Sequence, residues 1–171
     1  METKNIKNCE SGSWETKMMC SEGLALVKDQ NGKWGYIDEK GKLVIPCKWK
    51  SARSFQEGLA GVQADNDKWG FIDKTGKLVI PCQWKKADSF SEGLAVIIND
   101  NEKRGYIDKE GKLVIPCKWK KAIRFQEGLG GVQAENDKYG FIDKTGKLAI
   151  RNVETVFWYL KAWQCRVENR W

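Results

Sequence analysis

The hydrophobic and polar positions along this chain follow a pattern that repeats at a constant interval. The motif Lys-Trp-Gly-Tyr-Ile-Asp at 33–38 returns, with related residues, at 68–73, 103–108 and 138–143. The step from Lys33 to Lys68 is 35 residues, and the next two steps are equal. A fixed period in this range is typical of tandem-repeat architectures. The chain is therefore expected to be a row of similar structural units.

Three short apolar segments within each unit predict an antiparallel β-meander. In the first unit, the β-prone run 24–27 ends at Asn31-Gly32, a strong hairpin signal. The Trp-Gly strand follows, and after a further turn comes 43–45, which is apolar on both faces and should be covered on both sides. Because proline has no N–H to donate, Pro46 and its equivalents are expected to end this third strand.

The rest of each unit is expected to return the chain to the next meander, with aromatic anchors such as Trp49 and Phe55. Ala25 and Val27 share one face of the first strand, and the small alanine marks a close approach by a neighbouring unit. A unit of this size cannot bury its own apolar face, so stacking must supply the core. We divide the chain into a polar lead, 1–11, and four units, 12–46, 47–81, 82–116 and 117–151.

A change of periodicity after Arg151 predicts a different C-terminal segment. Apolar residues such as Val153, Val156, Phe157 and Leu160 recur at spacings of three or four, which is typical of an amphipathic helix. We expect 152–171 to form a helical segment that caps the last repeat. A tail unrelated to the fold is the alternative.

The expected fold is thus all-β: three-stranded meanders of 35 residues in an open stacked array with a helical cap. A closed small β-propeller is the main alternative. A propeller blade normally needs about 40–45 residues for its four strands. The shorter unit, with its proline stop, favours the open array.

Composition narrows the range of partners. Across 171 residues the net charge is +7, which favours anionic partners, yet no run of like charges suggests a nucleic-acid-binding arm. No apolar stretch is long enough to span a membrane, and the polar N-terminus lacks a secretory signal. The chain therefore resembles a cytoplasmic protein, although a secreted or surface protein whose signal had been removed would look the same.

Residues for catalysis are scarce. The sequence has no histidine, and its reactive residue types come in repeated copies, so we expect no enzyme, cofactor or metal site. The hairpin 65–67 (Asp-Asn-Asp) fits a turn better than a calcium loop. None of the six cysteines has Cys-x-x-Cys spacing, and three share one repeat position, where burial as small apolar residues is favoured over disulfides or zinc: Cys47, Cys82 and Cys117.

The candidate binding residues are a repeated tryptophan series with lysines beside it. Aromatic rings between cations can form a stacking surface for sugars or bases. The favoured alternative is that the rings pack in the core against the repeated phenylalanines Phe55, Phe90 and Phe125. The candidate residues are Trp14, Trp49, Trp84 and Trp119, with Lys48, Lys50, Lys85, Lys118 and Lys120.

These motifs together resemble the WG-containing repeat family of bacteria. The shared features are Gly-Leu-Ala-x-Val, Trp-Gly-Tyr-Ile-Asp and Gly-Lys-Leu-Val-Ile-Pro, in that order, over residues 12–151. Arg104 and Tyr139 depart from the family tryptophan, and a cysteine follows each proline. The resemblance implies a β-rich repeat module, often attached to other domains, for which no general activity is established.

From these observations we expect a non-catalytic module for protein–protein interaction or self-assembly. The alternative function is binding of cell-wall glycan or another polyanion through the Trp and Lys series. Neither a specific nucleic acid nor a membrane span is expected.

Overall fold

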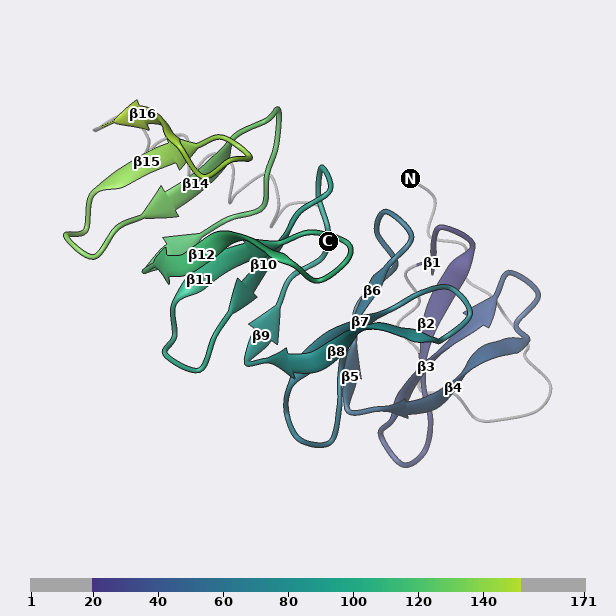
Figure 1. Ribbon diagram of the computed structural model, residues 1–171. Coiled ribbons are helices and arrows are strands. Elements are labelled where there is room, and N and C mark those ends of the chain that lie inside the picture. Colours follow the sequence, from purple (N-terminus) through teal and green to yellow (C-terminus); the bar gives the residue numbers. More distant parts are fainter. Residues whose placement is uncertain (1–19, 152–171) are drawn as a thin grey trace.

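The computed structural model describes residues 20–151, which form four antiparallel sheets of four strands each (Figure 1). Each sheet follows chain order, so its last strand is an edge strand. Sheet 1 contains β1 (Cys20–Ser21), β2 (Leu24–Lys28), β3 (Trp34–Asp38) and β4 (Leu43–Trp49); sheet 2 contains β5 (Ser51–Ala52), β6 (Ala60–Gln63), β7 (Trp69–Ile72) and β8 (Leu78–Trp84). Sheet 3 contains β9 (Lys86–Ala87), β10 (Ala95–Ile98), β11 (Arg104–Ile107) and β12 (Leu113–Trp119); sheet 4 contains β13 (Lys121–Ala122), β14 (Gly130–Gln133), β15 (Tyr139–Ile142) and β16 (Leu148–Arg151).

The all-β repeat architecture is confirmed, but the expected number of strands per unit was too low. The return segment contributes a short first strand to the following sheet, as Ser51 pairs with Gln63 and Ala52 with Val62. A strand of two residues has no periodicity that a sequence pattern could reveal. The sheets therefore divide the chain at Lys50, Lys85 and Lys120.

The expectation that proline ends the third strand was wrong. Strand β4 runs from Leu43 to Trp49 and passes through Pro46, and Trp49 pairs with Trp34. The register shifts on either side of Tyr36, opposite this part of β4. Because β4 is an edge strand with an irregular ladder, the missing N–H of proline breaks no essential hydrogen bond.

The glycine of the Trp-Gly motif allows the third and fourth strands of each sheet to approach closely. A Cβ atom on Gly70 would lie 2.4 Å from the carbonyl oxygen of Ile80, and one on Gly105 would lie 2.5 Å from that of Ile115. No side chain fits at these distances. The motif is therefore explained by the packing of the sheet itself.

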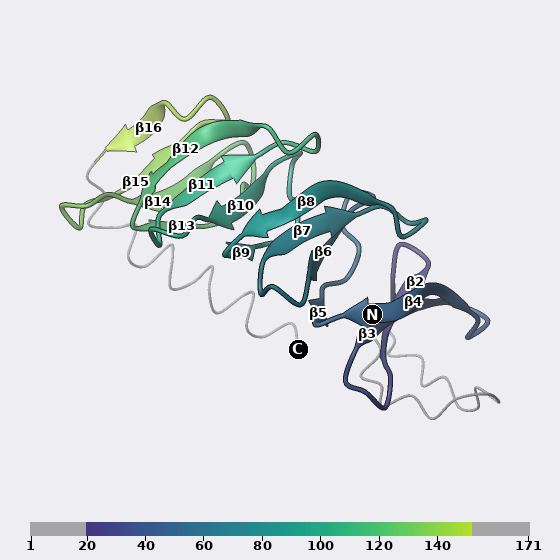
Figure 2. The ribbon, with the colours of Figure 1, turned by 60° about the horizontal axis from the view of Figure 1, so that its bottom comes forward.

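The four sheets lie in a row, each facing the next, and the hydrophobic core is divided among the joints between them (Figures 1 and 2). At the first joint, Tyr36 and Ile45 of sheet 1 pack with Phe55, Val62 and Ile72 of sheet 2. The rings of Tyr36 and Phe55 meet edge to face, with centroids 4.9 Å apart. Similar clusters join sheets 2 and 3 and sheets 3 and 4. The prediction that neighbouring repeats supply each other's core is confirmed.

Sheets 1 and 4 stand at opposite ends of the row and do not close into a ring (Figure 2). The isoleucines that face the next sheet, Ile45, Ile80 and Ile115, are at most 1% exposed, whereas Ile150 of sheet 4 is 42% exposed. The described residues thus form an open array. They include no helix long and apolar enough to cross a membrane. The predicted polar lead, 1–11, and the predicted helical cap, 152–171, lie outside the described range.

Candidate interaction surface

The tryptophans predicted as candidate binding residues pack onto the joints between sheets. Trp49 is 8% exposed and belongs to the first core cluster with Phe55, while Trp84 and Trp119 are half-buried against the second and third clusters. The indole N–H groups of all three are buried without a hydrogen-bond partner. Trp14 lies outside the described residues. The packing of these rings with the repeated phenylalanines agrees with the favoured interpretation of the series.

The lysines beside these tryptophans are engaged in contacts within the chain. The ammonium groups of Lys48 and Lys118 lie over the rings of Trp49 and Trp119, 4.9 and 5.0 Å from the ring centroids. A cation of the chain itself therefore occupies one face of each ring. The remaining three lysines form ion pairs with acids of the following hairpin: Lys50 with Asp67, Lys85 with Glu102, and Lys120 with Asp137.

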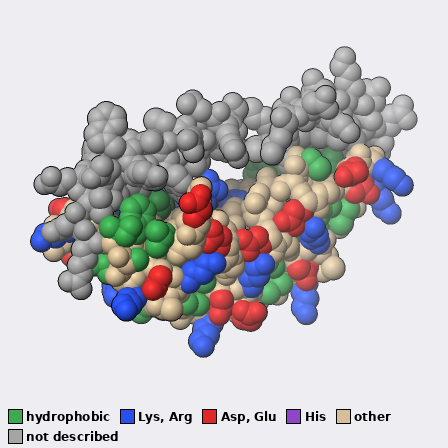
Figure 3. Space-filling model, turned by 90° about the horizontal axis from the view of Figure 1, so that it is seen from above, with side chains coloured by type: hydrophobic (Ala, Val, Ile, Leu, Met, Phe, Trp, Pro, Cys, Tyr) green, Lys and Arg blue, Asp and Glu red, His purple; other side chains and the backbone are tan. Residues whose placement is uncertain are grey.

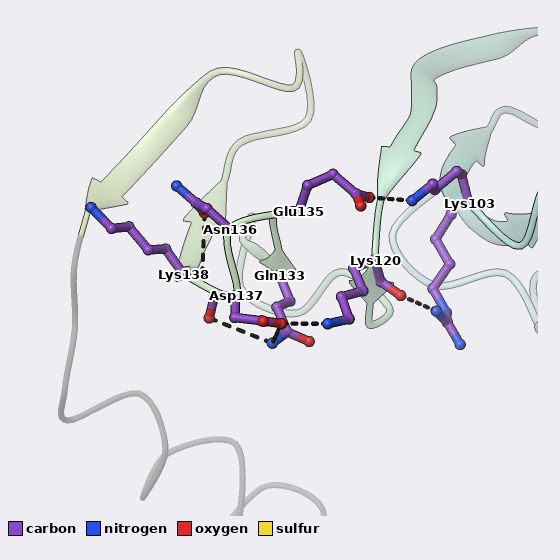
Figure 4. Close-up of polar contacts among 8 residues, drawn as sticks. Lys103, Lys120, Gln133, Glu135, Asn136, Asp137 and Lys138 are labelled. Carbon is purple, nitrogen blue, oxygen red and sulfur yellow. Dashed lines mark hydrogen bonds and ion pairs between the residues drawn. The ribbon is translucent and has the colours of Figure 1, made fainter.

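A second series of ion pairs links each sheet to the next, and sequence reasoning did not find it. Lys103 of sheet 3 pairs with Glu135 of sheet 4, while Asp137 contacts Lys120 and Gln133 (Figure 4). Equivalent pairs join the earlier sheets: Lys33 with Asp65, and Lys68 with Asp100. The sequence feature that could have indicated these pairs is a lysine followed 32 residues later by an acidic residue, which recurs in successive units.

Glu-Gly turns form a third repeated contact at the joints. The carboxylates of Glu22, Glu57 and Glu92 accept the N–H of the glycine in the next unit, and each also pairs with a lysine. Partial burial raises the pKa of Glu92, but the N–H of Gly128 and the ammonium of Lys144 lower that pKa by more. The net pKa of Glu92 lies below its ordinary value, so its ionised form stabilises the joint.

The clearest exposed feature is a row of apolar side chains on the edge strands β4, β8, β12 and β16, which we call the outer row. Each edge strand presents a leucine, followed on the first three strands by a valine, and every member is between 36% and 43% exposed. The expectation that this segment is covered on both faces was therefore wrong, since only the isoleucine is buried on β4, β8 and β12. The outer row consists of Leu43, Val44, Leu78, Val79, Leu113, Val114 and Leu148.

Charged groups are mixed over the surface. On the face seen in Figure 3, basic and acidic side chains lie next to one another and alternate with hydrophobic ones. Within 20–151, no group of three or more His, Cys, Asp or Glu residues is placed to hold a metal ion. The four cysteines in this range are free thiols: Cys20, Cys47, Cys82 and Cys117. Burial raises the pKa of the last three, which makes them less reactive.

Comparison with known proteins agrees with the repeat pattern. The family model described as "WG containing repeat" matches residues 34–69, 69–102 and 105–139. No curated protein matches this sequence.

Similar solved structures show the fold alone. The computationally designed protein Ika8 is 10% identical and aligns with 77% of this chain at a TM-score of 0.52, so the aligned part is 46% of Ika8. The designed protein Ika4 is 12% identical and aligns over 80% of this chain and 99% of its own length, with a TM-score of 0.50.

Proposed function

The chain belongs to the WG containing repeat family, and on that premise we propose that it is a non-catalytic module that binds protein surfaces, including further copies of itself. The observation that supports this proposal is the outer row. The same apolar pair recurs at the same place on the edge strands of the first three sheets, and its leucine recurs on the fourth. Large apolar side chains that stay exposed at the same place in every sheet are candidates for an interaction site.

Repetition provides the affinity that one such pair lacks. Burying the exposed part of a single leucine or valine contributes on the order of 1 kcal/mol. A partner that contacts several sheets at once turns the later contacts into intramolecular ones, so their effects multiply. A surface on which a weak apolar contact is repeated on several sheets therefore suits a partner that binds several of these contacts at once.

The edge strands favour docking through side chains over the addition of a strand. Pro46 interrupts the row of N–H donors on β4, and Lys42 and Lys48 flank the apolar pair. Proline and lysine on an edge strand both oppose pairing with another strand. We therefore propose a partner that offers an apolar face. The net charge of +7 favours one with acidic residues around that face.

Light scattering over a range of protein concentrations tests the self-association form of this proposal. The wild type is expected to increase in mean mass with concentration, whereas the triple variant V44K/V79K/V114K should remain monomeric. The triple variant N31K/N66K/N101K adds the same charge at exposed hairpin tips and is the control, which should associate as the wild type does. A wild type that stays monomeric, or a row variant that associates equally well, contradicts self-association through the outer row.

Glycan binding through the tryptophan series has less support. The ring of Trp49 is almost fully buried, and Lys48 occupies the position over it. Sugar stacking needs an open ring face. No arrangement around Trp84 or Trp119 favours this function over the packing already described.

A further inference from the structure

A cavity of about 140 Å³ lies beside sheet 3, and some of the residues that line it differ from those at the equivalent positions of the other units. Three basic residues line it: Arg53, which follows β5 of sheet 2, Lys86 on β9 and Arg104 on β11. Asp88 is the acidic residue in the lining, and the rest is apolar: Ala87, Val96, Ile98 and Ala122. The cavity thus draws on three consecutive sheets.

Two of these cations replace residues of another kind in the equivalent units. Arg104 stands where sheets 1, 2 and 4 have Trp34, Trp69 and Tyr139. Arg53 stands where the following units have Asp88 and Ile123. The repeat pattern accounts for the residues that recur, whereas these two arginines each occur once at their repeat position. Their shared location suggests a local role.

The register of sheet 3 brings two of the cations to one face. Lys86 is paired with Ile98, and Ile98 is paired with Arg104, on the neighbouring strands β9, β10 and β11. Directly opposed residues of adjacent strands have their side chains on the same face of the sheet. Lys86 and Arg104 therefore flank Ile98 on the same side, and all three line the cavity.

The guanidinium groups have donors left over for a ligand. Arg53 Nε is buried with no hydrogen-bond partner, while its Nη1 lies 3.4 Å from Oδ1 of Asp88. The ring of Trp69, 5.0 Å away, supports the same guanidinium. Arg104 donates one bond from Nη1 to the carbonyl oxygen of Lys120. Because an arginine has five N–H donors and these contacts use only Nη1, each side chain can still donate through Nη1 and Nη2 to an acceptor with two oxygens.

Positive charge is in excess at this site. Three basic residues and one acidic residue line the cavity, which leaves a surplus of two positive charges. The nearby Glu102 is in an ion pair with Lys85 and so does not cancel this surplus. The contact with Lys85 lowers the pKa of Glu102 most, and Lys86 and Arg104 lower this pKa further because both cations lie near the carboxylate.

We propose that this cavity binds a dianionic phosphate group. The two guanidinium groups supply paired donors to its oxygens, Lys86 supplies a further charge, and the double negative charge matches the local surplus. Inorganic phosphate and a phosphate monoester on a protein share this chemistry. The proposal is independent of the outer row, because it uses none of the same residues.

Nuclear magnetic resonance of the arginine side chains tests the proposal on the full chain. The Nε–H signals are followed at pH 7.5 and about 0.15 M salt, where exposed charges more than about 8 Å apart are largely screened. The added probes are inorganic phosphate, a peptide containing phosphoserine, and acetate. Phosphate is expected to move the Arg53 and Arg104 signals in a saturable manner, and acetate should bind at least tenfold more weakly.

Variants that restore residues found elsewhere in the repeat provide the test of location. R104W carries the residue of Trp34 and Trp69, and K86S carries that of Ser51, so neither change is foreign to this fold. Each should weaken phosphate binding about tenfold, the loss expected for one charge-assisted hydrogen bond. K121S makes the same change as K86S at the equivalent register of sheet 4, outside the cavity lining, and should bind as the wild type does.

The outcomes separate the sources and can overturn the site. Tighter binding of the peptide than of inorganic phosphate identifies a protein-borne phosphate, whereas equal binding identifies free phosphate. Shifts that never saturate, equal binding of acetate, or a loss in K121S as large as that in K86S would show that the cavity is not a phosphate site.

Discussion

Glycine at the Trp-Gly position illustrates how closely the chain is constrained at the scale of single residues. Gly70 admits no side chain because the backbone of Ile80 occupies the place of a Cβ atom. Gly61 lies on the adjacent strand β6, one residue before Val62, which is paired with Gly70. A Cβ atom on Gly61 would meet only ordinary contacts, and the nearest atom would be a methylene carbon of Arg53 at 3.4 Å. The packing of the neighbouring strand therefore requires glycine at position 70 but not at position 61.

The substitution Gly70→Ala is expected to lower the free energy of unfolding by about 3 kcal/mol, since the strands must separate to admit the methyl group. Gly61→Ala should change it by less than about 1 kcal/mol, because the new methyl group meets only ordinary contacts and alanine lowers the entropy of the unfolded chain only modestly. Urea unfolding of both variants measures the difference. Similar losses in the two variants would mean that the close approach at Gly70 does not constrain the fold.

The structure also explains what the hydroxyl groups do at the position where tyrosine and phenylalanine alternate between units. The hydroxyls of Tyr36 and Tyr106 each donate to a backbone carbonyl 2.8 Å away, those of Arg53 and Ile123. The intervening Phe71 fills the same core position without a hydroxyl. The sequence shows that tyrosine and phenylalanine alternate, but the acceptor of each hydroxyl depends on the return segment. That path could not be predicted from the period alone.

At the scale of elements, turns and central strands were the most predictable parts. Asn and Asp at the hairpins and glycine at the turns are local signals, and the alternation of alanine and valine on β6 identifies its buried face. The two-residue strand β5 and the passage of β4 through Pro46 were not predictable, because both depend on which strand lies at an edge. The exposure of Leu43 and Val44 follows from the same edge position.

The Glu-Gly joints predict a dependence of stability on pH. The pKa of Glu92 in the folded state lies below its ordinary value, so the joint is fully stabilised at neutral pH and loses this contribution as the pH falls through the folded-state pKa. Between pH 7 and pH 3, the free energy of unfolding should decrease less in E92Q than in the wild type. The difference is expected to be below about 1 kcal/mol, because the ion pair with Lys144 is partly solvated.

Glu127 is the matched control for this measurement. It holds the same position in sheet 4, after which the structure describes no further sheet that could offer a glycine N–H. E127Q should therefore retain the pH dependence of the wild type. If E127Q and E92Q alter that dependence equally, the effect comes from net charge and not from the joint.

At the scale of the whole molecule, the described sheets form an open row whose stability is distributed over its joints. Each joint combines an aromatic cluster, an ion pair between hairpins and a Glu-Gly contact, and the same set recurs three times. The period predicted this stacking, since no unit could bury its own face. The side of each sheet that stays exposed was not predictable, because the outer row and the buried isoleucines occupy the same short segment.

The most direct test of this account compares two equivalent isoleucines. Ile115 is fully buried at the joint with sheet 4, whereas Ile150, one unit later, is 42% exposed. Urea unfolding should show that Ile115→Ala lowers the free energy of unfolding by about 2–4 kcal/mol and that Ile150→Ala lowers it by less than about 1 kcal/mol. Equal losses in the two variants would contradict the claim that each sheet depends on the sheet that follows it.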